Sequence, residues 1–404
     1  MEFKTLEEVF EIKNGYTPSK NNPEFWEKGT IPWFRMEDIR ENGRILKDSI
    51  QHITPKALKG KKLFPKNSII ISTTATIGEH ALLIVDSLAN QQFTFLSKKA
   101  NCDIALDMKF FFYQCFLLGE WCKKNTNVSG FASVDMTAFK KYKFPIPPLE
   151  IQQEIVKILD AFTELNTELN TELKARKKQY EYYQNMLLDF NGINQNHKDA
   201  KERLTQKTYP KRLKSLLQTL APKGVEFRKL GEIINILKGK QLNKELLLDY
   251  GEYPVMNGGI HASGYWNEYN TDYPKIIISQ GGASAGYVNY MTSKFWAGAH
   301  CYAIELNSEK LNYKFLYYFL KNSQTILMKS QFGAGIPALN KADIETLTIP
   351  IPPLEIQQEI VKILDQFSIL TTDLLAGIPA EIKARKKQYE YYREKLLAFK
   401  PLKA

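Results

Sequence analysis

The sequence contains the same fifteen-residue stretch twice, letter for letter. IPPLEIQQEIVKILD runs from Ile146 to Asp160 and again from Ile351 to Asp365, an offset of 351 − 146 = 205 residues. A second block, KARKKQYEYY, runs from Lys174 to Tyr183 and again from Lys383 to Tyr392, an offset of 383 − 174 = 209. The long segments ahead of each copy look scarcely related. The duplication therefore predicts one framework that binds the same kind of partner twice, joined to two domains that read different targets.

The charge of the chain favours a polyanionic partner. The 404 residues include 55 Lys and Arg against 44 Asp and Glu, a net charge of +11. Much of this excess lies between Lys174 and Lys214. A local basic stretch of this kind is typical of proteins that bind nucleic acid, although many soluble proteins are equally basic. The length predicts two to three domains, each long enough to bury its own core.

Neither a membrane segment nor a disulfide framework is expected. No apolar run approaches the ~20 residues that span a bilayer, and the acidic N-terminal stretch does not fit a signal peptide. The 4 Cys form no Cys-x-x-Cys pair and have no His at ligand spacing. These features predict a cytoplasmic protein with free thiols and no metal site.

Each half shows the same series of elements ahead of its repeat. Each half contains a β-branched run that is followed by a loop of small polar residues, which is typical of a buried strand. The runs are Ser68–Ser72 and Lys275–Ser279. A helical stretch follows in each half, Met108–Cys122 and Tyr313–Met328. The fold class is therefore predicted to be α+β, with two such domains related by an internal pseudo-twofold duplication.

The repeat itself is predicted to be a long helix. A Pro-Pro pair precedes it, and apolar residues then recur at steps of three and four, which marks one face of a helix. Between the two blocks the first copy reads TELNTELNTEL from Thr163 to Leu173. The second copy instead contains Gly377 and Pro379, which should interrupt the helix. Long helices with an apolar stripe need a partner, and the nearest is the duplicate, packed antiparallel.

No catalytic motif is visible. The Pro-Pro pairs occur in Ile-Pro-Pro-Leu, not in the Asn/Asp-Pro-Pro-Tyr/Phe of an adenine methyltransferase. The Gly-rich loop Gly281–Gly286 lacks the Lys of a phosphate-binding loop, and the five His are scattered without metal-ligand spacing. The chain is expected to be no enzyme and to hold no cofactor.

The order of these motifs resembles a known family. It runs from a variable domain to a Pro-Pro-Leu-Glu-x-Gln-x-x-Ile helix, then to a second variable domain and the same helix again. NGYTPS with IPW, the IIIS strand, GAGIPALN and the TELN array add to the pattern. The chain resembles the DNA-specificity subunit of type I restriction-modification systems over essentially its whole length.

This resemblance implies two target-recognition domains that each read half of a split, asymmetric DNA site. The two helices would form an antiparallel spacer and dock two modification subunits. S-adenosylmethionine, ATP and Mg²⁺ would then belong to the modification and restriction subunits, and this chain would be non-catalytic. The implied domains are 1–145 and 224–350 for recognition, 146–190 and 351–404 for the spacer helices, and 191–223 for a basic polar linker.

Candidate DNA-binding residues lie in loops and in the basic block. Arg suits guanine, whereas Asn and Gln suit adenine, although loop residues of these types often cap elements instead. The candidates for base reading are Arg35, Thr73, Thr74, Thr76, Asn257, His261, Gln280 and Ser284. The candidates for phosphate contact are Lys174, Arg176, Lys177, Lys178, Lys383, Arg385, Lys386 and Lys387. Because these last residues are repeated alike, they could equally face the modification subunits.

Candidate partner-binding residues come from the apolar positions of the repeat. Some of them must instead form the seam between the helices, and the sequence does not divide the two groups. The candidates are Leu149, Ile151, Ile155, Tyr180, Tyr183, Leu354, Ile356, Ile360, Tyr389 and Tyr392. Two other classes of protein stay open: an enzyme with an unrecognised active site, and a duplicated coiled-coil scaffold that does not bind DNA.

Overall fold

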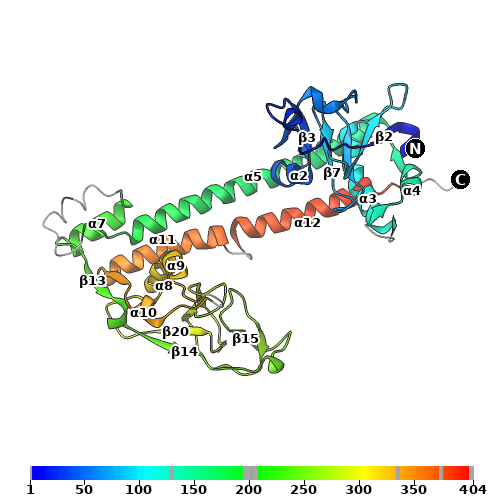
Figure 1. Cartoon of the computed structure of the whole chain (residues 1–404). Coiled ribbons are helices and arrows are strands. Elements are labelled where there is room, and N and C mark those ends of the chain that lie inside the picture. The colour runs from blue at the N-terminus through cyan, green and yellow to red at the C-terminus, as the bar shows by residue number, and fades with distance from the viewer. Residues whose placement is uncertain are drawn as a thin grey trace. The chain divides into compact units, whose positions relative to one another are not determined.

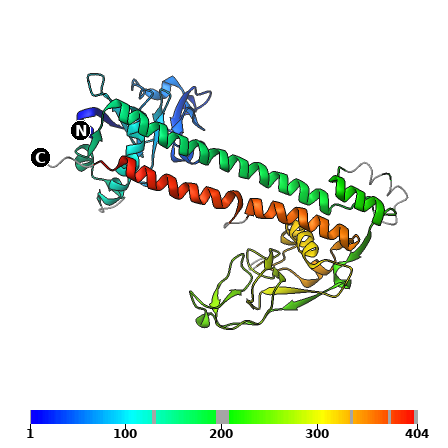
Figure 2. The same ribbon diagram turned by 180° about the vertical axis from the view of Figure 1, so that it is seen from behind.

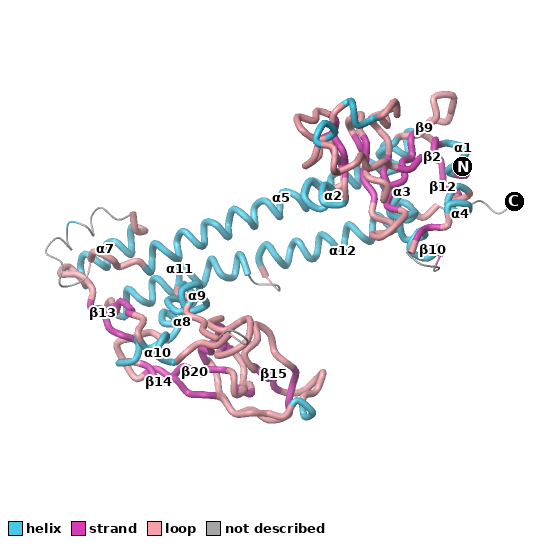
Figure 3. Tube along the Cα trace, in the orientation of Figure 1, coloured by secondary structure: helices cyan, strands magenta, loops and turns pink. Residues whose placement is uncertain are grey.

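The chain folds into two compact units, each containing one divergent segment and parts of both helical repeats (Figure 1). Unit 1 comprises Met1–Glu168 and Ile382–Ala404, and unit 2 comprises Leu169–Glu381. Helices and strands alternate in both units, which confirms the predicted α+β class (Figure 3). The computed structural model describes residues 2–127, 132–193, 202, 208–333, 337–372 and 376–399.

Unit 1 is organised around two small sheets. One has the strand order β2-β9-β6-β7-β4 and the other β5-β3-β8, while β1 pairs with β12 and β10 with β11. The strands are β1 (Glu2–Thr5), β2 (Phe10–Asn14), β3 (Ile31–Phe34), β4 (Ile45–Leu46), β5 (His52–Ile53), β6 (Ile69–Ser72), β7 (His80–Leu83), β8 (Leu88–Ala89), β9 (Phe93–Lys98), β10 (Thr126–Asn127), β11 (Ser133–Val134) and β12 (Lys143–Ile146). The helices are α1 (Leu6–Val9), α2 (Met36–Asn42), α3 (Met108–Lys124) and α4 (Met136–Lys140), with 3-10 turns η1 (Pro23–Phe25) and η2 (Pro55–Leu58).

Strand β6 shows why its sequence is apolar at every position. Ile69 and Ile71 pack with Phe110 of α3 in one buried cluster, whereas Ile70 packs with Phe34 and other residues in a second cluster. Successive side chains of a strand point to opposite faces, so a strand buried on both faces is apolar throughout. The β-branched run therefore forms the centre of the unit.

Unit 2 repeats this plan with different residues. Its larger sheet has the order β14-β20-β17-β18 and its smaller sheet β16-β15-β19, while β13 pairs with β21. The strands are β13 (Glu226–Lys229), β14 (Ile234–Lys238), β15 (Tyr253–Met256), β16 (Gly264–Trp266), β17 (Lys275–Ser279), β18 (Val288–Met291), β19 (Trp296–Ala297), β20 (Cys301–Leu306) and β21 (Thr348–Ile351). The shorter helices are α7 (Lys211–Leu220), α8 (Tyr313–Asn322), α9 (Gln324–Lys329) and α10 (Lys341–Glu345), with 3-10 turns η3 (Leu230–Glu232) and η4 (Lys244–Leu246). The second predicted helical stretch is thus divided at Ser323 into α8 and α9.

The repeats form α5 (Leu149–Leu188), α11 (Leu354–Thr372) and α12 (Gly377–Leu397). In unit 1 the Phe162 ring lies 5.5 Å from Tyr392, so the early part of α5 packs against the late part of α12 (Figure 2). In unit 2 the Phe367 ring lies 5.1 Å from Tyr183, so α11 packs against the late part of α5. Each pairing joins an early segment of one repeat to a late segment of the other, which confirms the predicted antiparallel arrangement within each unit. None of the described helices is both long and apolar enough to cross a membrane.

The predicted interruption of the second repeat is confirmed. Helix α11 ends at Thr372 and α12 begins at Gly377. Gly377 has a φ of +73°, and a Cβ at this position would lie 2.6 Å from the carbonyl oxygen of Ile369. Only glycine accepts both the backbone conformation and the close approach without strain.

The segment expected to be a polar linker contains an ordered helix. Helix α7 lies against α11, and its Leu213 and Leu217 are fully buried in the core of unit 2. The two leucines are four residues apart and therefore share one face, while the basic side chains of Lys211 and Arg212 are exposed. The basic residues Lys211 and Arg212 therefore lie on the outer face of α7, while residues 194–201 and 203–207 of the predicted linker lie outside the described residues.

A buried glutamine fastens the first repeat to the recognition segment of unit 1. The Gln152 side chain is fully buried, and its Oε1 accepts a hydrogen bond from the Asp107 amide at 2.8 Å. Its Nε2 donates to the carbonyl oxygens of Ala105 at 2.9 Å and of Pro147 at 2.7 Å. One side chain therefore joins the start of α5, the Pro-Pro lead-in and the N-cap of α3.

Gln357 makes the same three contacts in unit 2. Its Oε1 accepts a hydrogen bond from the Asn312 amide at 2.7 Å. Its Nε2 donates to the carbonyl oxygens of Lys310 at 2.8 Å and of Pro352 at 2.6 Å. Asn312 is the N-cap of α8, as Asp107 is the N-cap of α3. We call this arrangement the glutamine clamp.

An aspartate adds a second attachment two turns further along each repeat. Asp160 accepts from Lys109 Nζ at 2.6 Å and from the Tyr113 hydroxyl at 2.7 Å, both on α3. Asp365 accepts in the same way from Lys314 and Tyr318 of α8. Burial, and then the neighbouring carboxylate, raise the pKa of the Tyr113 hydroxyl, which therefore stays protonated as a donor.

We expect Gln152→Leu to lower the free energy of unfolding of unit 1 by roughly 1 to 3 kcal/mol, because three backbone groups lose their side-chain partner and the bond to the Pro147 carbonyl is buried. Denaturant unfolding followed by circular dichroism measures this change. Gln153→Leu is the matched control, because Gln153 is exposed and surface changes stay within about 0.5 kcal/mol. Equal stability of the two variants would contradict the clamp.

Unit 1 contains a buried histidine. His80 is 1% exposed and its ring packs against Phe112 and Phe116. Burial, and then the charge of Arg44, lower the pKa of His80 to about 3. The folded chain therefore keeps His80 neutral at pH values where the unfolded chain protonates it.

We expect the stability of unit 1 to fall as the pH drops below the unfolded pKa of about 6.5, by up to about 1.4 kcal/mol per pH unit. The loss should continue towards the folded pKa of about 3. Thermal unfolding at pH 7.5, 6 and 5 measures it. Comparison with His80→Asn isolates this residue, because the variant should lose part of the pH slope. An unchanged slope in that variant would show that His80 is not responsible.

Candidate functional site

The two units place three loop positions at equivalent points of the same framework. In unit 1, Ser72 at the end of β6 pairs with Phe93 of β9. In unit 2, Ser279 at the end of β17 pairs with Cys301 of β20. The positions beside these pairs therefore correspond: Thr73 with Gln280 and Gln92 with His300. Backbone hydrogen bonds repeat as well, from the Thr73 amide to Gln92 at 3.1 Å and from the Gln280 amide to His300 at 2.9 Å.

The short parallel pairs supply the third equivalent position. Phe34 pairs with Ala89 in unit 1, and Met256 pairs with Ala297 in unit 2. The residues that follow these strands are Arg35 and Asn257, so the two predicted reading residues occupy the same point of the fold. We call Arg35, Thr73, Gln92 and their counterparts Asn257, Gln280, His300 the strand-end positions.

Arg35 is partly accessible to solvent. Its side chain is 30% exposed, its guanidinium lies 5.9 Å from the centre of the Trp33 ring, and Glu37 is 3.8 Å from its Nε. Its buried Nε has no hydrogen-bond partner among the described residues. In unit 2, Asn257 is used differently, because its Oδ1 accepts from the His300 amide at 3.2 Å. Asn257 therefore holds the loop that carries His300.

Gln92 and His300 occupy strand-end positions but were not among the candidates predicted from the sequence. Gln92 Nε2 donates to Thr76 Oγ1 at 3.0 Å and to the Thr74 carbonyl at 3.3 Å, so it supports the loop after β6. His300 is exposed. Their positions in the sequence offered a signal. Gln92 directly precedes β9 and His300 directly precedes β20, and these strands pair with the isoleucine-rich strands β6 and β17.

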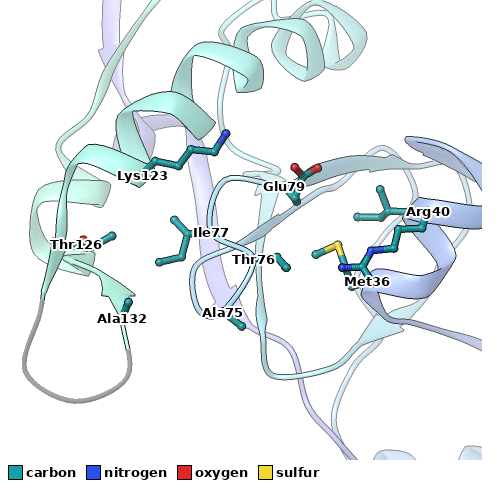
Figure 4. Close-up of a pocket in the computed structure, with 10 residues that line it drawn as sticks. Met36, Arg40, Ala75, Thr76, Ile77, Glu79, Lys123, Thr126 and Ala132 are labelled. Carbon is teal, nitrogen blue, oxygen red and sulfur yellow. The ribbon is translucent and has the colours of Figure 1, made fainter. Parts of the chain in front are cut away.

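Two hollows flank the loop after β6 in unit 1. One has a volume of about 490 Å³ and is lined by residues that include Arg35, Thr74 and Gln92. The other has a volume of about 650 Å³, and its lining includes Thr76, Arg40 and Lys123 (Figure 4). Ala75 and Thr76 lie between Met36 and Arg40 on one side and Thr126 and Ala132 on the other in this view. Each hollow is lined by two basic side chains and one acidic side chain, Lys20, Arg35 and Glu37 in the first and Arg40, Lys123 and Glu79 in the second.

The remaining predicted reading residues differ in accessibility. Thr73 is only 6% exposed and its hydroxyl bonds to that of Thr94 at 2.9 Å, so its prediction as a base-reading residue is wrong. Gln280 Oε1 is buried without a hydrogen-bond partner among the described residues. His261 is exposed and Ser284 is half-buried, both in loops of unit 2.

The basic block presents its lysines to solvent on both repeats. The Arg176 Nη1 donates to Gln179 at 3.1 Å, and the Arg385 Nη1 donates to Gln388 at 3.2 Å, so the two arginines are partly engaged along their own helices. The exposed members are Lys174, Lys177, Lys178, Lys383, Lys386 and Lys387. Exposed lysines suit phosphate contact, and they suit acidic protein surfaces equally well.

Several predicted partner residues instead belong to the interior. Ile155 is 5% exposed, and Ile356 and Ile360 are fully buried, so these three side chains cannot contact another subunit from the folded units. Their prediction as partner-binding residues is wrong, because the helix face that carries them packs on its own unit.

The four predicted tyrosines line the helix seams. Tyr180 and Tyr183 pack against Phe367, and Tyr389 and Tyr392 pack against Phe162. The neighbouring Tyr182 and Tyr391, which sequence reasoning passed over, are each 57% exposed.

Exposed side chains of the repeat remain alike in both units. Leu149 is 37% exposed and its counterpart Leu354 is 39% exposed. The polar positions that are exposed in both copies are Glu150, Gln153 and Lys157, with Glu355, Gln358 and Lys362. Internal packing does not require these identities, so a shared external contact is the simplest physical reason for them.

Comparison with known proteins agrees with this architecture. The family model of the type I restriction modification DNA specificity domain matches residues 1–178 and 222–384. The chain is 40% identical over 391 residues to the type I restriction enzyme EcoprrI specificity subunit of Escherichia coli, covering 93% of this chain and 89% of that one. It is 30% identical over 297 residues to the EcoR124I/EcoR124II specificity subunit of Escherichia coli, covering 68% and 69%.

Solved structures share the fold. The S subunit of a type I restriction-modification system from M. genitalium superposes with a TM-score of 0.59 at 20% identity, covering 99% of this chain and 96% of that chain. A chain from a structure that describes complex assembly and conformational transition of the type I R-M system superposes with a TM-score of 0.63 at 17% identity. The match covers 98% of this chain and 97% of that chain. With two matched regions, a near full-length relative and a duplicated framework that carries divergent strand ends, the chain belongs to the type I restriction modification DNA specificity family.

Proposed function

We propose that this chain is the non-catalytic specificity subunit of a type I restriction-modification complex and reads a bipartite, asymmetric DNA site. The observation that carries the proposal is the equivalence of the strand-end positions. The same backbone points hold Arg35 and Gln92 in unit 1 but Asn257 and His300 in unit 2. One scaffold with two sets of donors and acceptors suits recognition of two different base sequences.

The repeated helices supply the second half of the proposal. Side chains that are identical and exposed in both units, such as Leu149 with Leu354 and Lys157 with Lys362, support docking of two copies of one modification subunit. S-adenosylmethionine and methyl transfer to adenine belong to that subunit, and ATP and Mg²⁺ to separate restriction subunits. The complex acts in the cytoplasm, where it meets chromosomal DNA.

Long-read methylation sequencing tests the function directly. DNA from cells that express this chain with its neighbouring modification subunit is compared with DNA from cells that lack only this chain. We expect a split, adenine-methylated motif that appears only with the chain. Absence of a new motif, with the modification subunit shown to be expressed, would favour a scaffold that does not select DNA.

Single strand-end substitutions should change one half-site at a time. We expect Arg35→Gln to alter the preferred base at one position of one half-site, because a bidentate Arg contact is worth roughly 1 to 3 kcal/mol of discrimination. His300→Ala should alter only the other half-site. The methylated motif of each variant measures both effects, and the unaffected half-site is the internal control. A variant that changes both half-sites together would contradict separate reading by the two units.

The TELN array should set the gap between the half-sites. The boundary between the units falls within it, after Glu168. Removal of Thr167–Asn170 shortens a helix by ~6 Å and turns it by ~40°. We therefore expect the gap to change by one or two base pairs while both half-sites stay the same.

A length-preserving double variant, Glu164→Ala with Glu168→Ala, is the control for this deletion and should leave the gap unchanged. The methylated motif again provides the measurement. Altered half-sites in the deletion variant would argue against a spacing role.

A further inference from the structure

A third hollow of unit 1 is more basic than the two that flank the loop after β6. Its volume is about 780 Å³, and β2, the end of β9 and the stretch ahead of β6 line it. Its lining includes one acidic residue, Glu11, against five lysines. We call it the lysine hollow, and its lysines are Lys13, Lys61, Lys62, Lys98 and Lys99. Such an excess of positive charge on one concave surface suits a polyanion.

The acidic residue cancels little of this charge. Lys13 Nζ lies 2.9 Å from the Glu11 carboxylate, so one lysine already pairs with it. The hydrogen bond and the charge of Lys13, and then the charges of the neighbouring lysines, hold the pKa of Glu11 below its ordinary value. The carboxylate is therefore committed to Lys13, and the remaining lysines keep their net charge.

Two of the remaining lysines bond to the backbone. Lys98 Nζ donates to the carbonyl oxygen of Ile104, and Lys99 Nζ donates to that of Glu7, each at 2.6 Å. A carbonyl group carries no net charge, so these bonds fix the ammonium groups without neutralising them. Both lysines therefore raise the electrostatic potential of the hollow from fixed places.

Lys61 and Lys62 are exposed lysines without a carboxylate partner. Neither forms an ion pair with another described residue. Lys61 Nζ lies 3.9 Å from the centre of the Tyr16 ring, and the Tyr16 carbonyl oxygen accepts a hydrogen bond from Trp33 Nε1 at 2.9 Å. The residue that supports Lys61 is thus held in the fold, and the two ammonium groups are available to an external anion.

The equivalent strands of unit 2 do not carry these lysines. The strand register places Leu237 where unit 1 has Lys13. It likewise places Leu306 and Asn307 where unit 1 has Lys98 and Lys99. The potential that the strands give to the hollow is therefore a property of unit 1.

The stretch ahead of the central strand reverses its charge between the units. Phe64 in unit 1 and Thr271 in unit 2 form equivalent bridges to the segment ahead of the short parallel strand. The residue three positions earlier is Lys61 in unit 1 but Glu268 in unit 2. A polyanion that is attracted at this place in unit 1 would be repelled in unit 2.

The lysine hollow adjoins the hollow that contains Arg35. Tyr16 lines the lysine hollow, and the next residue, Thr17, lines the other together with Arg35 and Gln92. Two consecutive residues therefore separate the lysines from the strand-end positions. A nucleic acid that follows the strand ends passes directly onto the lysines.

We propose that the lysine hollow binds the sugar-phosphate backbone of double-stranded DNA just beyond the half-site that unit 1 reads. Lys61 and Lys62 neutralise phosphates there without selecting a base, because phosphate groups carry no sequence information. Unit 2 has a carboxylate in place of Lys61, so the contact to flanking DNA is made on one side of the bipartite site only. The proposal rests on the proposed function, because it takes DNA as the polyanion.

The test measures binding of DNA duplexes to the complex of the full chain with its modification subunit over a series of salt concentrations. Each duplex carries the methylated motif and extends by about ten base pairs, one helical turn, beyond one half-site only. The half-site of unit 1 is the one that Arg35→Gln alters. The variant is Lys61→Gln with Lys62→Gln. The matched control is Lys140→Gln with Lys141→Gln, because these adjacent lysines of unit 1 are also exposed but do not line the hollow.

We expect the hollow variant to bind the duplex that extends beyond the half-site of unit 1 about tenfold more weakly. The slope of log K against log salt should fall in magnitude by about 2, since each phosphate contact contributes about 0.9. Binding to the duplex that extends beyond the other half-site, and the sequence of the methylated motif, should stay the same. The control should match the unaltered complex on both duplexes.

Three results would overturn the lysine hollow as a contact to flanking DNA. They are unchanged binding by the hollow variant, equal weakening on both duplexes, and equal weakening by the hollow variant and its control. Failure of the unaltered complex to prefer duplexes with the motif over duplexes with a scrambled motif would instead overturn the proposed function.

Discussion

The glutamine clamp is the interaction on which the rest of this structure depends. Gln152 and Gln357 are fully buried polar side chains, which is tolerated only because each satisfies one amide and two carbonyl groups. Those groups belong to the Pro-Pro lead-in and to the start of α3 or α8. The clamp therefore fixes the direction of each long helix with respect to the sheet it serves. The strand-end positions and the exposed helix faces are held at defined places within each unit as a result.

The clamp also changes the physical reading of the duplicated block. Identity between the two copies looks at first like the mark of a shared partner. Yet Gln152, Ile155 and Asp160 are identical to their counterparts for an internal reason, because each holds its own recognition segment. Internal packing does not explain why the exposed residues, such as Leu149 and Lys157, are also identical in the two copies. Partner binding must be argued from that smaller set, and helix α7 divides it further by covering only one copy.

The helices and strands could be predicted from neighbouring residues in the sequence. The accessibility of the site residues could not, because it depends on the pairing of strands that are far apart in the chain. The strand β6, the Pro-Pro lead-in and the break near Gly377 each follow from a few adjacent residues. Thr73 was misjudged because its hydroxyl partner, Thr94, is distant along the chain and becomes visible only when β6 pairs with β9. Helix α7 did carry a signal, since Leu213 and Leu217 are spaced for one face, but the surrounding basic residues gave the stretch the composition of a linker.

Helix α5 contributes to both units, which supports the proposed role of the TELN array in spacing. Helix α5 gives its first part to unit 1 and its last part to unit 2, so it is a shared structural element of both cores. Within it, Thr163 and Thr167 bond back to the carbonyl oxygens four residues earlier, which keeps these side chains within the helix. The array therefore behaves as continuous helix whose length is set by its number of tetrapeptides. Over the described residues the second repeat is divided between α11 and α12, whereas α5 runs without a break from Leu149 to Leu188.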